Sequence, residues 1–433
     1  MWEWIKDTRG VTGRQPRRAL RVVFVATFPF MLAAETSLAE CTTSTPCASA
    51  PTNLGTLGAD KSYALGVNRD GSVIVGESTI ADALNNQPLH AFRRASHHQG
   101  LRSRMQDLGT LGGHVSWARG VNRDGSVVVG SSPISGTNEF HAVRWTIGRL
   151  LPLVWMHDLG TLGGAQSYAH GVSGDGSVVV GQSQFQSSPL VHAFRWTKAQ
   201  GMVDLGIGDD SIASIAYGTN KDGSVVVGGK MMPGLPYIHA FRWTKAEGMV
   251  DLGTLPGGNN SSALGTNRDG SVVVGQSDTT SAPGSIHAFR WTKADGMVDL
   301  GTLGGPLSIA SGTNRDGSVV VGCSSVANDT QHYDGFQIWA CGPESWVPGP
   351  NIRAFRWTAA TNMQDLNTLV SDAGVKMPAM TMVAATGVSD NGLIVGFGQT
   401  PMELTGYTAF RICVATTSRR ACRLRRFLDC RCP

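Results

Sequence analysis

Four short apolar segments recur along this chain in a fixed order. In residues 261–301 they are SALGTN, SVVVGQS, HAFRWT and GMVDLG, separated by Gly, Asn, Asp and Ser. Their β-branched and aromatic residues, bounded by turn-forming residues, are typical of strands. SVVVG is apolar at consecutive positions, as expected of a strand covered on both faces, whereas HAFRWT alternates between two faces. No repeat contains a helical periodicity long enough for a core helix.

The same unit occurs seven times, about every 47 residues. The DGSVVVG-like segments carry Asp70, Asp124, Asp175, Asp222, Asp269, Asp316 and Asp390. The HAFRWT-like segments begin at His90, His141, His192, His239, His287, Arg353 and Thr408. The DLG-like segments begin at Asn53, Asp107, Asp158, Asp204, Asp251, Asp299 and Asp365. Repeats of this length and composition predict an all-β fold, a seven-bladed β-propeller of four-stranded antiparallel blades.

The two ends of the repeat region predict how the ring closes. The repeats begin with a partial unit, Asn53-Leu54-Gly55, and finish on a third strand that contains Arg411. The last blade therefore lacks an outer strand, and the first repeat has one to spare. We expect Thr52–Gly55 to form the outer strand of the blade that contains Arg411.

A regular spacing of charges predicts the strand register. In four repeats the Arg of FRW and the Asp of DLG are nine residues apart, as in Arg195 and Asp204. A four-residue loop, Lys198–Gly201, would place Thr197 opposite Met202 and Arg195 opposite Asp204. Opposite charges across an antiparallel pair stabilise it modestly, so we interpret these residues as structural rather than catalytic.

The N-terminal residues have the pattern of a secretory signal. Basic residues at 17, 18 and 21 precede an apolar run, Val22–Ala34, and a cleavage site after Ala39. The predicted organisation is a signal peptide at 1–39, a linker at 40–51, a propeller at 52–413 and a basic, Cys-rich tail at 414–433. The apolar run is short for a membrane span, which predicts no stable membrane insertion after cleavage. A start downstream of Met1, and a frameshift as the origin of the tail, both stay open.

Charge and cysteines narrow the partners and the compartment. Without the first 39 and the last fifteen residues, 24 basic and 28 acidic residues remain, which argues against nucleic acid as a partner. Eight cysteines in an exported chain are disulfide candidates. Cys323 and Cys341 bracket much of the only large insertion, about 323–352 in the sixth repeat, and we expect them to be bonded. The protein is expected to be a secreted monomer, with the periplasm or cell surface as alternatives.

No pattern in the chain indicates a catalytic, cofactor or metal site. The repeated histidines lie a full blade apart, so we interpret them as packing or hydrogen-bonding residues between blades. The NRDGS turns lack the distal Glu of a calcium loop, and their Asn residues are interpreted as turn-initiating. GTLGG is not followed by the residues of a phosphate loop, and no nucleophile elbow or zinc motif occurs.

The insertion carries the candidate ligand-binding residues: Tyr333, Phe336, Trp339 and Trp346. Exposed aromatic rings on a loop held by a disulfide would suit contact with a protein or a glycan. The alternative is that these rings cover the mouth of the central channel. The insertion lies on the face that carries the GTLGG segments and all length variation, where we expect a ligand.

The HAF, DGSVVVG and DLGTLGG segments resemble the HAF-repeat family of secreted bacterial proteins, from about Asn53 to Arg411. The chain departs from the pattern at Arg94-Ala95, at Arg353 and at Thr408. The resemblance implies an exported bacterial protein and no established activity. Members of the family also look like autotransporter passengers, in which a barrel follows the repeats; none follows here.

These observations predict a secreted binding or adhesion module without catalytic activity. The alternatives are a carbohydrate-active or other enzyme with a site at the central channel, and a truncated autotransporter passenger. Fold alone does not decide between them. Acidic or His residues that occur once and converge at the channel mouth would favour the enzyme.

Overall fold

The computed structural model describes residues 48–81, 88–96, 104–148, 153–186, 189–208, 210–234, 237–280, 285–327, 351–376, 379–400 and 407–414. These residues belong to one compact unit, Glu40–Pro433. Their 28 strands pair into five four-stranded sheets and one eight-stranded sheet. The eight-stranded sheet consists of β18–β21 and β22–β25, joined by a single parallel bridge between Ile286 and Leu307.

The strands have four roles, which repeat from sheet to sheet. The first strands are β2 (Ser62–Val67), β6 (Trp117–Val121), β10 (Gly163–Val172), β14 (Ala213–Thr219), β18 (Ser261–Thr266), β22 (Gly304–Thr313) and β26 (Thr381–Val388). The second strands are β3 (Val73–Thr79), β7 (Val127–Pro133), β11 (Val178–Phe185), β15 (Val225–Met231), β19 (Val272–Thr279), β23 (Val320–Val326) and β27 (Leu393–Gln399). The third strands are β4 (Leu89–Ala95), β8 (Phe140–Ile147), β12 (Val191–Thr197), β16 (Ile238–Thr244), β20 (Ser285–Thr292), β24 (Ile352–Thr358) and β28 (Tyr407–Cys413). The fourth strands are β5 (Met105–Asp107), β9 (Val154–Asp158), β13 (Gly201–Asp204), β17 (Gly248–Asp251), β21 (Gly296–Asp299), β25 (Asn362–Asp365) and β1 (Thr52–Asn53).

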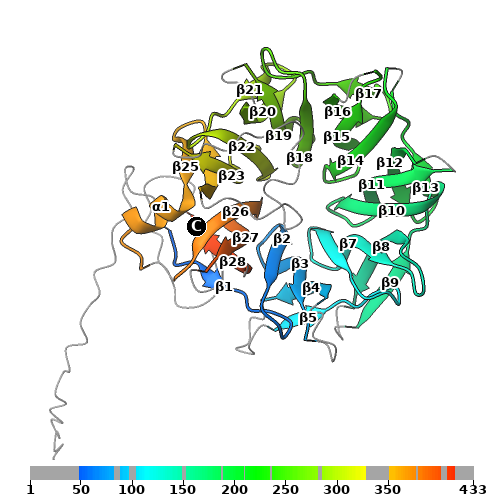
Figure 1. Cartoon of the computed structure of the whole chain (residues 1–433), viewed down its shortest axis with the longest axis horizontal. Helices are drawn as coiled ribbons and strands as arrows, with labels where there is room; N and C mark the ends of the chain where they lie inside the picture. The colour runs from blue at the N-terminus through cyan, green and yellow to red at the C-terminus, as the bar shows by residue number, and fades with distance from the viewer. Residues whose placement is uncertain are drawn as a thin grey trace, which may run out of the picture. The chain divides into compact units, whose positions relative to one another are not determined.

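The sheets lie around a common centre, with the first strands innermost (Figure 1). The second strands are buried between neighbouring sheets, as their apolar sequence predicts: Val127, Val128 and Val129 are all buried. Each innermost strand is joined to its second strand by a short turn in which Gly has a positive φ, for example +78° at Gly270. In the turn of β18 and β19, the Asn267 side chain accepts a hydrogen bond from the Val272 N–H, which confirms its turn-forming role.

The register of the third and fourth strands differs by one residue from our prediction. Thr197 pairs with Gly201 and Phe194 with Asp204, so Arg195 lies opposite Val203. The loop is one residue shorter than expected because Gly201 adopts a φ of +69° and already belongs to the strand. A shift of one residue moves a side chain to the other face of a sheet, and the predicted pairing of Arg195 with Asp204 is therefore wrong.

The Asp residues of the fourth strands pair instead with the repeated histidines. The His Nδ1 lies 2.7–2.9 Å from an Asp carboxylate oxygen in each of five sheets, in the pairs His90–Asp107, His141–Asp158, His192–Asp204, His239–Asp251 and His287–Asp299. Both partners belong to the same sheet, so the hydrogen bonds of these histidines lie within a blade and not between blades as expected, whereas their packing between blades stays a prediction. The pairs hold the outer strand against the third strand.

Two other repeated hydrogen bonds join neighbouring sheets. The Arg of FRW donates to the glycine carbonyl of the next turn, as from Arg290 Nε to Gly317 O at 3.1 Å. The Ala of HAF donates its N–H to a serine on the next innermost strand, as from Ala240 to Ser261 Oγ at 2.8 Å. The recurring sequence of the unit thus serves contacts between sheets as well as within them.

The N-terminal strand β1 pairs with the last third strand, β28, as predicted. Thr52 is opposite Arg411 and Asn53 is opposite Phe410. Sheet order in this region is β1-β28-β27-β26.

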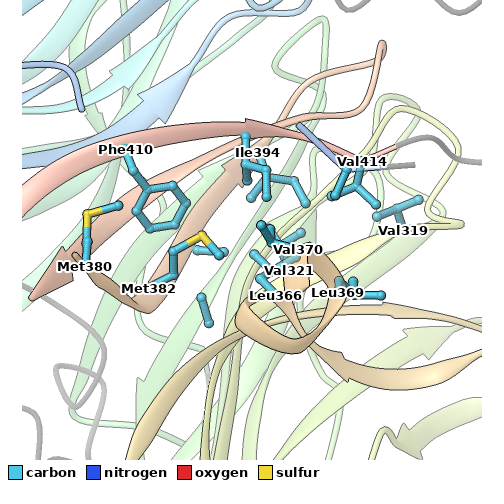
Figure 2. Packing of buried hydrophobic residues seen from close by; sticks show 14 residues of the cluster. Val319, Val321, Leu366, Leu369, Val370, Met380, Met382, Ile394, Phe410 and Val414 are labelled. Atoms are coloured by element: carbon cyan, nitrogen blue, oxygen red, sulfur yellow. The ribbon is translucent and has the colours of Figure 1, made fainter. Parts of the chain in front are cut away.

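One helix, α1 (Leu366–Asp372), departs from the expected all-strand pattern. Asp365 caps it by accepting a hydrogen bond from the Asn367 N–H at 2.8 Å. Its residues Leu366, Leu369 and Val370 join a buried cluster with side chains of β23 and of β26–β28, as Figure 2 shows. This burial explains why a segment of only seven residues is helical here.

Candidate functional site

The predicted aromatic contact residues lie in the segment 328–350, outside the described residues, together with Cys341. Cys323 is described: it is completely buried in β23, opposite Ala354 of β24. The aromatic site and the bond between Cys323 and Cys341 therefore stay predictions.

A cavity of about 260 Å³ lies where the innermost strands converge. Its wall is formed by residues of β2, β6, β10, β14, β18, β22 and β26. We call this cavity, with its two ends, the central channel. Glycine keeps the strands close together: a Cβ atom at Gly171 would lie 3.1 Å from the Tyr217 carbonyl of the next strand. The channel is consequently narrow and is walled largely by backbone.

Every innermost strand has a β-bulge in the segment Ala-X-Gly. In β10, Ala169 pairs with Gly181 and Gly171 with Val180, which leaves His170 as the extra residue. Bulges commonly re-aim side chains next to functional sites. The bulged residues, here called the bulge ring, are Leu65, Arg119, His170, Tyr217, Leu264, Ser311 and Thr386. Ser311 and Thr386 directly line the channel.

Three of the five polar residues of the bulge ring, Arg119, His170 and Tyr217, lie on the consecutive innermost strands β6, β10 and β14. The rings of His170 and Tyr217 have centroids 5.5 Å apart. Burial lowers the pKa of His170 to about 3, with a further contribution from the positive charge of Arg119. Burial also raises the pKa of Tyr217. Both side chains are therefore neutral near neutral pH, and His170 Nε2 is buried without a hydrogen-bond partner in the described residues.

The opposite end of the innermost strands carries a ring of cationic side chains. In each repeat, the residue that follows the turn Asn, or follows the residue in the place of that Asn, lines a second cavity of about 200 Å³. This cavity shares wall residues with the first. We call the residues at this position the turn ring: Arg69, Arg123, Gly174, Lys221, Arg268, Arg315 and Asp390. Backbone hydrogen bonds link its members, as from Lys221 N to Arg268 O at 3.0 Å. Five cations thus occupy adjacent positions around one end of the channel.

The position of Asp390 corrects the repeat alignment. The turn glycines Gly71 and Gly392 both have positive φ, which places Asn391, and not Asp390, at the position of Asp70. Asp390 takes the position of Arg69 in the last sheet and forms an ion pair with that residue. The Asp390 N–H also donates to the Arg69 carbonyl.

Electrostatic interactions within the turn ring confirm that its charges are close. Desolvation, followed by the nearby Arg315, Arg69 and Arg123, lowers the pKa of Arg268, while Asp390 opposes the shift. Within the described residues, Arg123, Lys221, Arg268 and Arg315 take part in no salt bridge. The end of the channel is therefore strongly electropositive.

The sequence analysis missed the two rings for different reasons. It treated every repeated position as structural, so the Arg of NRDG was passed over together with the turn that carries it. The bulge ring was visible as the variable position in Ala-X-Gly, between two constant residues. Its importance depends on the bulge, which the apolar pattern does not predict.

No carboxylate or metal cluster accompanies these rings in the part of the chain that the structure describes. Within it, no three His, Cys, Asp or Glu side chains are grouped so that they could hold a metal ion. A search of the same residues finds no helix with the length and hydropathy of a membrane span.

Comparison with known proteins gives the class of fold. No protein-family model matches the chain, and no curated protein matches it. An oligogalacturonate lyase from Vibrio parahaemolyticus is similar in structure, with a TM-score of 0.50 and 11% identity over 85% of this chain and 97% of that chain.

Two further structures are more distant. The β-propeller domain of the Trilobed protease from Pyrococcus furiosus gives a TM-score of 0.48 and 9% identity, over 82% of this chain and 94% of that chain. TolB from Acinetobacter baumannii gives 0.41 and 10%, over 71% of this chain and 63% of TolB, less than two thirds of its length. The chain is an all-β protein of four-stranded antiparallel sheets, with β-propellers among its structural neighbours. Identities this low concern the fold alone.

Proposed function

We propose that this chain is an exported, seven-bladed β-propeller that binds the end of a glycan chain in its central channel without catalysing a reaction. Seven blades follow if the eight-stranded sheet is divided at its single parallel bridge. Contacts of β2 with β26, β27 and β28 support a closed ring. So does the hydrogen bond from the Ala409 N–H to Ser62 Oγ at 3.0 Å.

The observation that carries the binding proposal is the contrast between the bulge ring and its surroundings. The residues on either side of the bulged position are Ala and Gly in every repeat, whereas the bulged residues are Leu, Arg, His, Tyr, Leu, Ser and Thr. A purely structural position would be expected to repeat like its neighbours. Ser311 and Thr386 of this ring line the cavity, and variation at one position around the channel is what a site needs in order to present different groups to one ligand.

The composition of the bulge ring fits a glycan better than a folded protein. Leu65 and Leu264 belong to one apolar cluster, while Arg119, His170 and Tyr217 supply hydrogen-bonding groups and aromatic rings. Sugars present apolar faces and hydroxyl groups together, which such a mixed wall can recognise. A cavity of about 260 Å³ has room for the end of a chain only.

The proposal is tested by substituting a bulged residue with one that other repeats already contain at the same position. Arg119→Leu and His170→Leu introduce the residue that two other bulges contain, so the backbone should be unaffected. We expect each variant to lose binding to the neutral oligosaccharides that the wild-type protein retains on a glycan array. Lys293→Gln, at a side chain that is 90% exposed and outside both rings, is the control and should keep that binding. Equal array profiles for all four proteins would contradict the proposal.

An enzyme remains the second candidate function, and one observation favours it. His170 and Tyr217, two groups that can exchange protons, each occur once in the bulge ring and lie beside each other. Release of reducing ends from a polysaccharide by the wild-type protein, abolished in His170→Leu, would establish the enzyme in place of the binding module.

A further inference from the structure

We propose that the turn ring is a binding site for a small multivalent oxyanion, at the end of the channel opposite the bulge ring. Arg69, Arg123, Lys221, Arg268 and Arg315 line one cavity with a single carboxylate, Asp390. This site does not depend on the proposed glycan-binding function, because the turn ring lies beyond the end of each innermost strand, four residues after the bulge ring in the sequence.

The first step of the argument concerns how the charges are held. Consecutive members of the turn ring are joined by backbone hydrogen bonds of 2.8–3.2 Å, from Arg123 to Gly174, Gly174 to Lys221, Lys221 to Arg268, and Arg268 to Arg315. The side chains therefore start from fixed positions around the axis. The site is preorganised in this respect, which reduces the entropic cost of binding a ligand.

The second step concerns charge balance. Five cations and one carboxylate give this cavity a net charge of +4 at neutral pH, in a repeat region where acidic residues outnumber basic ones. Like charges at adjacent positions repel each other, and Asp390 is paired with Arg69 alone. An anion in the cavity would relieve the repulsion among the other four cations, which gives binding a source of free energy beyond direct contacts.

The third step identifies the ligand chemistry. Guanidinium groups donate paired hydrogen bonds to phosphate, sulfate and carboxylate oxygens. Arg and Lys side chains arranged in a ring can contact several anionic groups at once, so affinity should rise steeply with ligand valence. The cavity of about 200 Å³ limits the ligand to a few such groups. Clustered oxyanions of this size occur as short phosphate chains or as the end of an acidic oligosaccharide.

Isothermal titration with orthophosphate, tripolyphosphate and a tetrauronate oligosaccharide tests the site and separates its two possible sources. We expect tripolyphosphate or the tetrauronate to bind at least about tenfold more tightly than orthophosphate. Binding should weaken as salt concentration rises. Preference for tripolyphosphate would identify phosphate, and preference for the tetrauronate would identify uronate, as the group recognised.

Variants that change the charge in both directions keep the test independent of folding. Arg268→Gln should weaken binding of the preferred probe by about tenfold. Asp390→Asn should strengthen it by releasing Arg69. Lys293→Gln removes an equal charge from a side chain that is 90% exposed and should leave the affinity unchanged.

Three results would overturn the proposal. The first is the absence of binding by either multivalent probe at millimolar concentration. The second is an affinity that does not depend on ligand valence. The third is a loss in Lys293→Gln that equals the loss in Arg268→Gln, since binding would then follow overall charge rather than the turn ring.

Discussion

The two ends of the channel differ in which part of the repeat is kept constant. At the turn ring the same side-chain chemistry recurs, with Arg or Lys at five positions, and the two exceptions are Gly174 and Asp390. At the bulge ring the backbone irregularity recurs while the side chains differ. Repetition of a side chain therefore does not mark it as structural, and repetition of a backbone feature can create a variable site.

The largest expected effect comes from disturbing the backbone that both rings share. Gly275 is the last residue of a VVVG segment. A Cβ atom added there would lie 1.9 Å from the carbonyl oxygen of Ser262, on the neighbouring innermost strand. Because backbone atoms cannot move aside easily, Gly275→Ala should lower the free energy of unfolding by about 3 kcal/mol. Urea denaturation measures this change.

The control for that prediction is a glycine whose only requirement is its backbone angle. Gly253 has a φ of +72°, and a Cβ atom added there would meet no other atom within 4 Å. Gly253→Ala should cost about 1 kcal/mol. If the two variants are equally stable, the close approach at the bulge does not explain why this glycine recurs.

The next largest effect concerns the link between neighbouring sheets. Arg290→Ala removes the hydrogen bond from Arg290 Nε to the Gly317 carbonyl and leaves the ion pair between His287 and Asp299 in place. We expect a loss of about 1.5 kcal/mol in the free energy of unfolding, since the donor is charged. Thermal denaturation of Arg290→Ala and of Arg290→Lys should show losses in both variants. An unaltered stability of Arg290→Ala would mean that the contact is too solvated to matter.

Acid should weaken the outer strands. Burial favours a higher pKa for Asp107 and Asp299, but hydrogen bonds from His90 and His287, together with backbone N–H groups, outweigh it and lower the pKa of both carboxyls. A lowered pKa in the folded state stabilises the protein above the unfolded value, near 4. This stabilisation is lost as the pH falls below that value.

Urea denaturation between pH 5 and pH 2.5 measures the acid effect. We expect the free energy of unfolding to fall across this range, and to fall less steeply in His287→Gln, which lacks the imidazole that hydrogen-bonds to Asp299. Identical slopes for the variant and the wild type would show that the pair contributes nothing to acid sensitivity.

Much of the fold was predictable, because the apolar pattern determines strand type and the repeat determines strand number. The pairing of Thr52 with Arg411 followed from the partial units at the two ends. The register of Arg195 and Asp204 did not follow, since it depends on the positive φ of Gly201. The helix α1 was missed because its stability comes from tertiary burial of Leu366, Leu369 and Val370 rather than from local periodicity.

The candidate site was less predictable than the fold. Neither the neutral state of His170 nor its proximity to Tyr217 can be deduced from positions 47 residues apart in the sequence. Both depend on the convergence of innermost strands at one axis. The turn ring illustrates the same limit, since its five cations line one cavity only when their strands are arranged around a centre.

The central claim is that the bulge ring serves function rather than folding. Its most direct test is a substitution that we expect to abolish binding while having the smallest effect on stability. His170→Leu removes a buried nitrogen that has no hydrogen-bond partner in the described residues, so the free energy of unfolding should change by no more than about 0.5 kcal/mol. The decisive measurement is glycan binding and urea denaturation on the same preparations of wild type and His170→Leu. We predict that binding is lost while stability is retained. Retained binding together with a marked loss of stability would contradict the account.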